Sequence, residues 1–318
     1  MSARAEPMQY VASAMGSLAS LDVPLGPRTT YRVGGRADLL VEARSEHDLS
    51  RLADALAGAW PDGVAPVMVM GKGSNTLVAD AGFRGVVVVL GRDFDWVSIK
   101  GTNMSVGGAT SLPVAARQSA TAGLSGLEWA VGVPGSIGGA VRMNAGGHGS
   151  DMAAVLTRYR SIDLATGETV ERAADCLELG YRSSSLKLTE VVLQVDLELV
   201  EADPDECRQR IAEVVAWRRA NQPGGSNAGS VFTNPVGDSA GRLIDAAGMK
   251  GRRIGTAVVS KKHANFIQVD DGGSADDVWT LVDVVRREVM RRFGVELVAE
   301  LRMVGDFVPS TSSRDGGL

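Results

Sequence analysis

A serine near the middle of the chain is the first residue whose surroundings could serve chemistry. Ser230 lies in the stretch SNAGSVFTNP (226–235), after turn-forming residues and before a short run of strand-forming residues. A nucleophilic serine needs a neighbouring base, and no histidine lies within about thirty residues on either side. The residues alone leave its role open, with a serine at the exit of a turn as the structural alternative.

Two glycine-rich segments are the second such feature. The chain has 39 glycines among 318 residues, well above the usual share of about 7%. One segment is GKGSN (71–75), and the other is EWAVGVPGSIGGAVRMNAGGHGS (128–150). Bare backbone lets a flat or highly charged ligand approach and exposes N–H donors to it. Tight packing alone would explain one such segment, but two of them after strand-like runs favour a large phosphorylated cofactor.

Neither of the standard phosphate-binding motifs fits the first segment. A Walker A loop would need glycine where the chain has Pro66, and serine or threonine where it has Gly73. A Rossmann fingerprint would need glycine at the sixth position from Gly71, which is Thr76. A turn of this kind can still aim consecutive backbone N–H groups at an anion.

Composition predicts a soluble cytoplasmic protein without a metal site. The net charge is −5, which argues against a broad nucleic-acid surface. Cys176 and Cys207 have no metal-binding spacing, and the three histidines are scattered. No basic segment followed by an apolar core opens the chain, and no apolar run approaches the roughly 18 residues that span a bilayer.

Strands and helices alternate between two loose ends. We expect helices at 45–58, near 111–122, at 203–221 and at 274–294, and strands at 38–43, 66–71, 85–90, 96–100, 104–109, 158–164, 191–200, 230–235, 256–260, 265–270 and 296–305. Ser45 and Asp48 form a capping box for the first helix, and Asp203 with Pro204 opens the third. On the final strand, Glu300 and Arg302 should point to one face.

A set of motifs in fixed order resembles one family of flavoenzymes. The motifs are YRVGGRAD (31–38), GKGSNTLVAD (71–80), GLEWAVGVPGSIGGAVRMNAGGHGSDM (126–152), YRSS (181–184), AGSVFTNP (228–235), AGRLIDAAGMKGRRIGTAVVSKKHANFI (240–267) and ELRMVG (300–305). They are similar to the UDP-N-acetylenolpyruvoylglucosamine reductases (MurB), from about residue 22 to 306. The early glycine motifs belong to the wider vanillyl-alcohol-oxidase-type FAD fold, whereas the later motifs are specific to the reductase.

The resemblance implies an α+β fold of the FAD-binding vanillyl-alcohol-oxidase/PCMH type, with two α/β subdomains and a C-terminal α+β substrate domain. The expected boundaries are a flexible N-terminus (1–18), FAD-binding subdomains at 19–92 and 93–202, a substrate-binding domain at 203–307 and a disordered tail (308–318). The resemblance also implies non-covalent FAD and a shorter type of reductase, without the inserted loop that carries a substrate-covering tyrosine.

The implied reaction is reduction of the enolpyruvyl ether of UDP-N-acetylglucosamine to UDP-N-acetylmuramate, with NADPH as hydride source. By family analogy Ser230 is the proton donor, and Arg182 and Glu300 assist at the substrate carboxylate. The implied substrate-binding residues are Tyr181, Asn234 and Arg302. The implied cofactor-binding residues are Tyr31, Gly34, Gly71, Lys72, Gly73, Ser74, Asn75, Gly132, Pro134, Gly135, Ser136, Gly138, Gly139, Asn144 and Gly146. The enzyme is expected to be a monomer that binds neither nucleic acid nor membrane.

These residue types suit that chemistry. Hydride addition builds negative charge beside the carboxylate, and the charged, forked guanidinium of Arg182 can hold that group. Glu300 helps only when it carries a proton, a form that burial and a neighbouring negative charge both favour. A strongly basic intermediate can take a proton from a weak acid such as Ser230, so no histidine is required. Taken alone, Ser230 is more typical of a turn, Arg182 of a surface ion pair and Glu300 of a solvated strand.

Some positions depart from the family pattern, and two alternatives remain open. Lys72, Asn221 and Thr233 replace residues that other members commonly have, which leaves their contacts to phosphates undetermined. The first alternative is an FAD oxidase of the same fold acting on an alcohol or aldonolactone. Such oxidases often attach the flavin through a histidine in the early glycine loop, and GKGSN has none. The second is a flavin-binding protein that has lost its chemistry, although Ser230, Arg182 and Glu300 are all retained.

Overall fold

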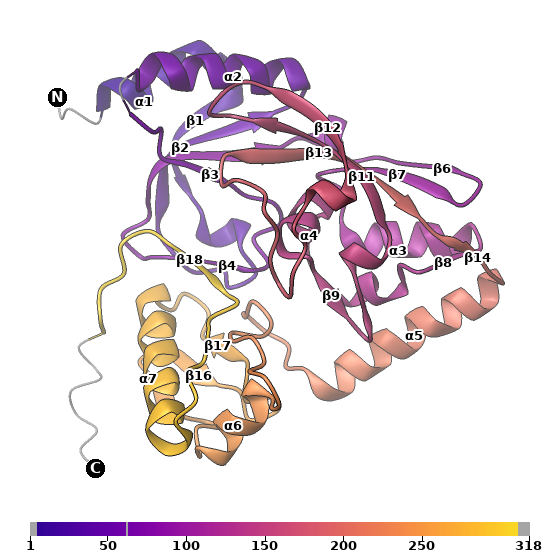
Figure 1. Ribbon diagram of the computed structural model, residues 1–318. Coiled ribbons are helices and arrows are strands. Elements are labelled where there is room, and N and C mark those ends of the chain that lie inside the picture. Colours follow the sequence, from indigo (N-terminus) through magenta and orange to yellow (C-terminus); the bar gives the residue numbers. More distant parts are fainter. Residues whose placement is uncertain (1–4, 62, 311–318) are drawn as a thin grey trace. The chain divides into compact units, whose positions relative to one another are not determined.

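The computed structural model describes residues 5–61 and 63–310. The chain forms two compact units, each built from separate stretches of sequence (Figure 1). The first unit comprises residues 1–23, 38–72 and 85–218, and the second comprises 24–37, 73–84 and 219–318. The second unit therefore combines the C-terminal third of the chain with two short segments that precede residue 85.

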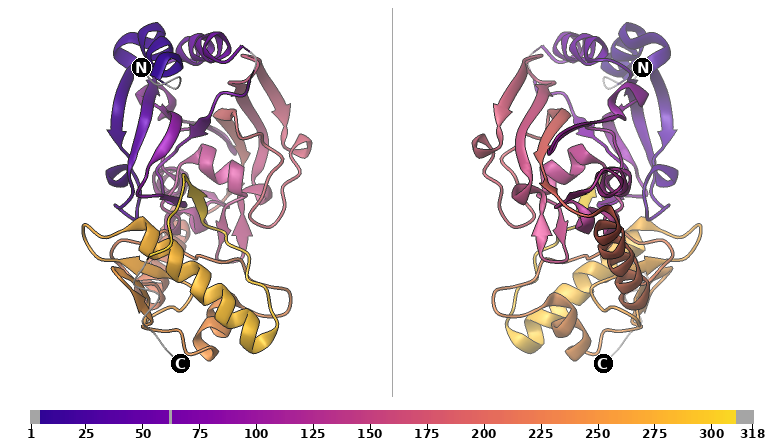
Figure 2. Two further views of the ribbon diagram at one scale, coloured as in Figure 1. Left: turned by 90° about the vertical axis from the view of Figure 1, so that its left-hand side faces the viewer. Right: turned by 90° about the vertical axis from the view of Figure 1, so that its right-hand side faces the viewer.

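A four-stranded sheet and two helices form one half of the first unit. The strand order is β1 (Ala19–Pro24), β2 (Arg36–Ala43), β5 (Phe83–Leu90) and β3 (Val67–Val69), and β3 pairs with β5 in parallel. Helices α1 (Ala5–Met15) and α2 (Glu46–Ala59) lie side by side against this sheet (Figures 1 and 2).

The N-terminal segment is more ordered than the sequence predicts. Residues 1–18 were expected to be loose, but residues 5–15 form α1, and Met8, Val11 and Met15 are buried in the core. Arg51 of α2 donates a hydrogen bond to the carbonyl of Ala14 at 2.6 Å. The prediction of a flexible segment is therefore wrong for residues 5–18, because three well-spaced apolar side chains are enough to anchor a short helix.

Helix α2 begins with the predicted capping box. The Ser45 hydroxyl accepts a hydrogen bond from the Asp48 amide at 3.2 Å, and the Asp48 carboxylate accepts one from the Ser45 amide at 3.0 Å. Leu49, Leu52 and Leu56 are buried on the face that meets the sheet. Two otherwise unpaired amides are thus satisfied where the helix starts.

Replacing Ser45 with alanine should lower the free energy of unfolding by about 1 kcal/mol, because the Asp48 amide loses its acceptor. Chemical denaturation measures this difference. Ser50→Ala in the same helix is the control: its hydroxyl bonds the Glu46 carbonyl and caps nothing, so stability should change little. Equal losses for the two variants would contradict the capping role.

A five-stranded antiparallel sheet forms the other half of the first unit. Its strand order is β12 (Thr169–Ala173), β11 (Leu156–Asp163), β13 (Glu190–Glu198), β7 (Asn103–Gly107) and β6 (Val97–Lys100). Both faces of β13 are buried. Val191 and Leu193 join the core beneath α1 and α2, whereas Val192, on the other face, joins the core beneath α3 (Leu112–Thr121) and α4 (Ile137–Met143). This two-sided strand connects the two halves of the unit.

Short strand pairs and a long helix complete the first unit. β8 (Leu124–Ser125) pairs with β14 (Val200–Glu201), and β9 (Gly146–Gly147) pairs with β10 (Ser150–Asp151). Helix α5 (Pro204–Asn221) starts as predicted, because the Asp203 carboxylate accepts hydrogen bonds from the Asp205 and Glu206 amides at 2.7 and 3.2 Å. The division between the two units falls within the last turn of this helix.

The second unit packs two helices on a small sheet. Its strands β15 (Arg253–Ile254), β16 (Ala257–Val259) and β17 (Ile267–Val269) are antiparallel, and α6 (Ala240–Ala246) and α7 (Ala275–Phe293) pack beside them (Figure 1). β18 (Arg302–Val304) pairs in parallel with β4 (Thr76–Val78). The predicted long helix is confirmed: its predicted apolar face is buried, comprising Val278, Leu281, Val282, Val285 and Val289.

Two predicted strands of this unit are wrong in extent. In the described chain, residues 230–235 form no ladder and contribute an isolated bridge between Phe232 and Ala299. The predicted final strand at 296–305 shortens to 302–304, so Glu300 precedes it. Val231, Phe232 and Thr233 favour a strand, but their backbone groups find partners in a side chain and in loops.

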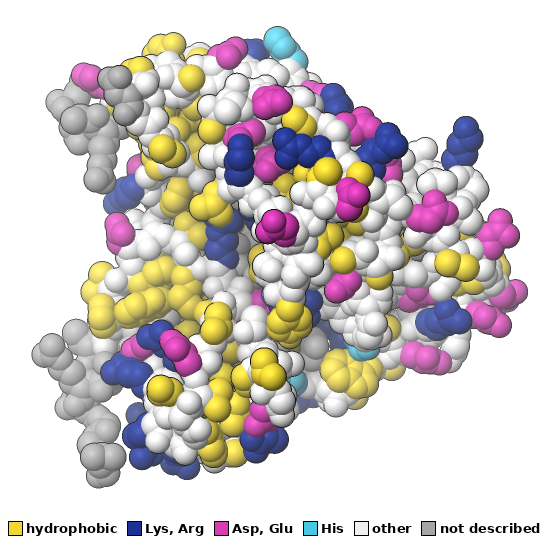
Figure 3. All heavy atoms as spheres, in the orientation of Figure 1, with side chains coloured by type: hydrophobic (Ala, Val, Ile, Leu, Met, Phe, Trp, Pro, Cys, Tyr) yellow, Lys and Arg dark blue, Asp and Glu magenta, His cyan; other side chains and the backbone are white. Residues whose placement is uncertain are grey.

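The described residues include no helix that is both long and apolar enough to cross a membrane. Acidic and basic side chains are interspersed on the face shown in Figure 3, in keeping with the small net charge of −5. The predicted tail lies outside the described residues from residue 311 onward.

Candidate functional site

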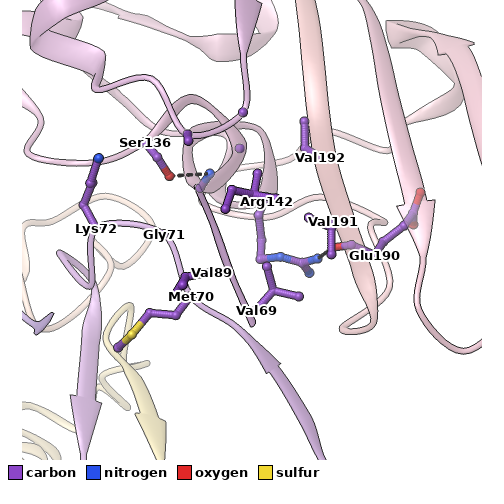
Figure 4. A pocket seen from close by; sticks show the side chains of 15 residues that line it. Val69, Met70, Gly71, Lys72, Val89, Ser136, Arg142, Glu190, Val191 and Val192 are labelled. Atoms are coloured by element: carbon purple, nitrogen blue, oxygen red, sulfur yellow. Dashed lines mark hydrogen bonds between the residues drawn. The ribbon is translucent and has the colours of Figure 1, made fainter. Parts of the chain in front are cut away.

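A cavity in the first unit is bordered by the glycine segments (Figure 4). Its volume is about 590 Å³ including its open mouth. One part of the wall is apolar, from the ends of β3 and β5 and the start of β13. The other part is backbone from Gly71, Gly108, Gly138 and Gly139, with the hydroxyl of Ser136. The charged side chains of Lys72, Arg142 and Glu190 also line the cavity. An apolar wall beside closely packed backbone and charged groups suits a large ligand that is aromatic at one end and anionic at the other.

Glycine is required at the closest approaches around this cavity. A Cβ atom on Gly71 would lie 2.3 Å from the Ser136 hydroxyl, and one on Gly108 would lie 2.0 Å from the Val192 carbonyl oxygen. A Cβ on Gly138 would lie 3.2 Å from the Gly108 carbonyl oxygen. Ser136 accepts a hydrogen bond from the Gly139 amide at 3.3 Å, which opens α4. The glycines therefore bring three backbone segments together where a ligand would meet them.

Replacing Gly71 with alanine should weaken binding of the predicted FAD about 10-fold, because the new methyl group must turn the Ser136 hydroxyl away from its place in the cavity wall. Titration of flavin-free protein with FAD, followed by flavin fluorescence, measures the affinity. Gly147→Ala is the matched control from the second glycine segment, since a Cβ there meets nothing within 4 Å. Unchanged affinity in Gly71→Ala would show that FAD binds elsewhere.

Arg182 lies in the first unit, on a loop with an uncommon backbone conformation. Its φ is 57°, in the left-handed region, and its guanidinium donates a hydrogen bond to the Gly146 carbonyl at 2.8 Å. The guanidinium carbon lies 5.4 Å from the ring centroid of Tyr181, which is 61% exposed. The predicted pair Tyr181–Arg182 thus lies beside the second glycine segment.

The loop that carries Arg182 is held from both sides by α4. Asn144, left-handed at the end of that helix, donates to the Gly180 carbonyl at 3.0 Å. The Ser184 hydroxyl donates to the Arg142 carbonyl at 2.8 Å, and the Arg142 guanidinium donates to the carbonyls of Leu186, Lys187 and Glu190. Strain at Arg182 is therefore maintained by a network around it.

Ser230 and Glu300 lie in the second unit, and Val231, the residue after Ser230, is hydrogen-bonded to the backbone of Glu300. The Val231 carbonyl accepts a hydrogen bond from the Glu300 amide at 2.8 Å. Asn75 donates from its side chain to the Glu300 carbonyl at 3.0 Å, and its own carbonyl accepts from Arg302 at 3.1 Å. Both Ser230 and Glu300 are half-buried. The three predicted catalytic residues are thus divided between the units, with Arg182 in the first.

Ser230 borders a second cavity, which lies wholly within the second unit. Its charged or polar lining residues include Asn234, Arg242, Asp245, Lys250, Lys262, His263 and Asn265. Burial, and then the neighbouring Lys250, lowers the pKa of His263, so its ring is neutral near pH 7. Asn234 already accepts a hydrogen bond from the Ala240 amide at 3.1 Å. Arg242 pairs with Asp238, and Lys250 pairs with Asp245 at 2.6 Å, while the Lys262 ammonium donates to the Arg219 carbonyl at 2.6 Å. The cavity is therefore polar, with most of its charges balanced.

The other predicted cofactor residues are divided between the two units. Gly132, Pro134, Gly135, Asn144 and Gly146 lie in the first, and Tyr31, Gly34, Gly73, Ser74 and Asn75 lie in the second. Gly34 and Gly73 have φ values of 112° and 61°, and a Cβ on either would collide with neighbouring backbone.

Tyr31 is fully buried, its pKa is raised by burial, and its hydroxyl has no hydrogen-bond partner among the described residues. Arg302 is half-buried, and burial lowers the pKa of its guanidinium.

Several lining residues were not predicted from sequence. Gly108, Arg142 and Glu190 border the first cavity, and Asn265 and Lys250 border the second. The Gly107–Gly108 pair at the end of a strand was a visible signal for Gly108. Arg142 lies within the second glycine segment, and Lys250 and Asn265 lie within the motif at 240–267, but nothing in their spacing marks them as lining residues. Glu190 lies outside the quoted motifs and carries no local signal. No cluster of three or more His, Cys, Asp or Glu side chains in residues 5–61 and 63–310 could hold a metal ion.

Comparisons with known proteins identify both parts of the chain. Residues 37–172 match the model of an FAD binding domain, and residues 221–304 match the C-terminal domain of UDP-N-acetylenolpyruvoylglucosamine reductase. A reductase of this name from Symbiobacterium thermophilum is 44% identical, covering 89% of this chain and 91% of the relative. One from Heliobacterium modesticaldum is 42% identical and covers 92% of both. The crystal structure of the Thermus caldophilus reductase superposes with a TM-score of 0.77 at 37% identity, over 90% of this chain and 98% of that one.

The residues of the first cavity fit FAD. Its apolar wall can hold a flavin ring system, and Lys72 beside Gly71 places a positive charge where a diphosphate can bind. The α+β fold, with an FAD-binding part followed by a separate C-terminal domain, is confirmed, and the reductase interpretation is favoured over the oxidase alternative. The chain belongs to the UDP-N-acetylenolpyruvoylglucosamine reductase family.

Proposed function

We propose that this protein reduces the enolpyruvyl ether of UDP-N-acetylglucosamine to UDP-N-acetylmuramate, a step in the synthesis of peptidoglycan precursors, with NADPH as the hydride source. The observation that carries the proposal is the match to the reductase's C-terminal domain at residues 221–304, which include Ser230, Asn234, Glu300 and Arg302. Relatives of the same name are similar over about nine tenths of the chain.

Bound FAD supplies the hydride that reaches the terminal carbon of the enolpyruvyl group. Arg182 then meets the charge that develops at the adjacent carbon and spreads into the carboxylate. Its guanidinium stays charged and offers two parallel donors to a carboxylate. The hydrogen bond to Gly146 and the strained backbone keep this side chain preorganised, which avoids reorganisation as the charge appears.

Ser230 gives its hydroxyl proton to the carbon beside the carboxylate. That carbon is strongly basic after hydride addition, so a weak acid in the right position suffices. Gly229, with φ of 79° and open space where a Cβ would be, leaves the approach to Ser230 clear. The serine therefore acts without a histidine partner, because it never has to become a nucleophile.

Glu300 acts in its protonated form, as a hydrogen-bond donor that stabilises the developing negative charge. An ionised carboxylate there would repel the intermediate. Its backbone is held by Val231 on one side and Asn75 on the other. The hydrogen bond to Val231 thus fixes the backbone of Glu300 relative to the residue that follows Ser230.

The remaining assignments follow from the same function. Tyr181, Asn234 and Arg302 bind the nucleotide-sugar, and the predicted glycine-segment residues bind FAD. The polar cavity beside Ser230 offers hydrogen-bonding side chains to the polar part of the substrate. We further propose that the enzyme is a cytoplasmic monomer, and that residues 19–92 and 93–202 are FAD-binding subdomains with a substrate domain at 203–307.

A steady-state assay tests the proposed function. Purified yellow protein should oxidise NADPH only when the enolpyruvyl substrate is present, and mass spectrometry should find one product that is heavier by two hydrogens. Oxidation by oxygen alone should be slow. Rapid production of peroxide without the substrate would contradict the reductase and support the oxidase alternative.

A further inference from the structure

One buried amide side chain holds the backbone that follows Ser230. Asn265 is 3% exposed, and its carboxamide forms two hydrogen bonds with the same residue. Its oxygen accepts from the Phe232 amide at 3.0 Å, and its nitrogen donates to the Phe232 carbonyl at 2.8 Å. The Asn265 main-chain carbonyl also accepts from the Val231 amide at 2.9 Å. Asn265 thus satisfies three backbone groups within two consecutive residues.

This contact takes the place of a neighbouring β-strand. Residues 230–233 belong to no ladder, although buried backbone groups require partners. On the other side of the segment, the Val231 carbonyl accepts from Glu300 and the Thr233 amide donates to the Val298 carbonyl at 2.9 Å. The segment is therefore held between Asn265 and residues 298–300. The position of Ser230 depends on these contacts, since it immediately precedes Val231.

The loop that presents Asn265 is itself fixed. The Asn265 amide donates to Nδ1 of His263 at 3.3 Å, and the Phe266 amide donates to the His263 carbonyl at 3.0 Å. The Ser260 hydroxyl, which is buried, accepts from the Lys262 amide at 3.1 Å and the His263 amide at 3.4 Å. A rigid loop lets one side chain transmit its position to the segment that it holds.

We propose that Asn265 is a positioning residue for the reaction: its carboxamide holds the backbone N–H and C=O of Phe232 and so aims the Ser230 hydroxyl, with Glu300 placed across the same segment. The inference rests on the proposed role of Ser230 as proton donor. Asparagine is required because the site needs one donor and one acceptor side by side. Aspartate in its ionised form lacks the donor, and leucine of similar size lacks both.

The two half-reactions separate positioning from folding. Transfer of hydride from NADPH to FAD needs no proton from Ser230, whereas reduction of the enolpyruvyl substrate does. Stopped-flow absorbance under anaerobic conditions measures both rates in Asn265→Leu and Asn265→Asp holoenzyme. We expect substrate reduction to slow about 10- to 100-fold, as for small misplacements of a catalytic group, and FAD reduction to remain within about twofold. Equal slowing of both half-reactions, or slowing of neither, would overturn the proposal.

The aspartate variant provides a second, chemical test. A protonated carboxyl group has one donor and one acceptor, as a carboxamide does, and burial favours that form. The rate of Asn265→Asp relative to the unmodified enzyme should therefore rise as the pH is lowered, whereas the ratio for Asn265→Leu should stay low. Other charged or titratable groups face Asn265: the same cavity is lined by Asp245, Lys250, Lys262 and His263, and Glu300 lies across the segment. Because these groups can also change the rate with pH, each variant is compared with the unmodified enzyme at the same pH. Parallel pH profiles for the two variants would contradict the hydrogen-bond exchange.

Thr280→Val is the matched control for the loss of buried hydrogen bonds in the same unit. Its hydroxyl donates to the Asp276 carbonyl at 2.7 Å and accepts from the Ser310 amide at 3.0 Å, and the residue is 4% exposed. Both half-reactions should proceed as in the unmodified enzyme. Amide hydrogen exchange should show faster exchange at residues 231–233 in the Asn265 variants and not in Thr280→Val. Unchanged exchange there would show that Asn265 does not hold the segment.

Failure of the positioning role can be told apart from failure of the proposed function. If the Ser230→Ala variant reduces the substrate at the normal rate, Ser230 is not the proton donor, and its role in the proposed function is wrong. If Ser230→Ala is slow but the Asn265 variants are fast, the proton donor stands and the positioning role is wrong.

Discussion

Ser230→Ala should still allow NADPH to bleach the bound flavin, while reduction of the enolpyruvyl substrate slows by about 10²- to 10⁴-fold, the usual contribution of a positioned general acid. The reason is that alanine removes the proton without changing the backbone, which remains held by Asn265 and Glu300. Single-turnover measurements of the two half-reactions show the difference directly.

Ser274→Ala is the control for this substitution, because it removes a serine hydroxyl from the same unit. The Ser274 hydroxyl accepts from the Asp277 amide at 3.2 Å at the start of α7. Its loss should lower stability by about 1 kcal/mol and leave both half-reactions unchanged. Normal substrate reduction in Ser230→Ala would contradict the proton-donor role.

Glu300→Gln should retain far more activity than Glu300→Ala, which we expect to lose about 10²-fold or more in substrate reduction. Glutamine keeps a neutral hydrogen-bond donor in nearly the same volume, whereas alanine removes it. Both variants keep the backbone contacts to Val231 and Asn75, so the comparison isolates the side chain. The measured quantity is kcat with saturating substrate.

Glu296→Gln is the matched control, since Glu296 is an exposed residue of the same unit and should tolerate the change. If Glu300→Gln and Glu300→Ala lose activity equally, the working group is the carboxylate, and a protonated Glu300 is wrong.

The helices could be predicted from sequence because their ends carry local signals. Ser45 with Asp48, Asp203 with Pro204, and Gly294 at the end of α7 each satisfy or terminate a helix through residues within four positions. Helix α1 was missed because its residues are small and its anchoring side chains are few. Its stability comes from packing on α2 and the sheet, which local pattern does not report.

The candidate site was predictable only in part, for a related reason. Glycines and the Ser230 motif stand out along the chain, whereas Glu190 enters the first cavity from β13, a strand about forty residues after the second glycine segment. Residues 230–235 have strand propensity, but the backbone of Phe232 is hydrogen-bonded to the side chain of Asn265, 33 positions away in sequence. A contact of that kind depends on tertiary structure, so propensity alone assigned the wrong element.

Anaerobic reoxidation of the reduced enzyme is the most direct test of the central claim, which is that the chain reduces an enolpyruvyl nucleotide-sugar. Enzyme reduced with one equivalent of NADPH is mixed either with enolpyruvyl-UDP-N-acetylglucosamine or with UDP-N-acetylglucosamine, which lacks the double bond. We expect rapid return of the yellow flavin spectrum, with formation of UDP-N-acetylmuramate, in the first mixture and not in the second. A flavin that stays reduced with both compounds and reoxidises only when oxygen is admitted would contradict it.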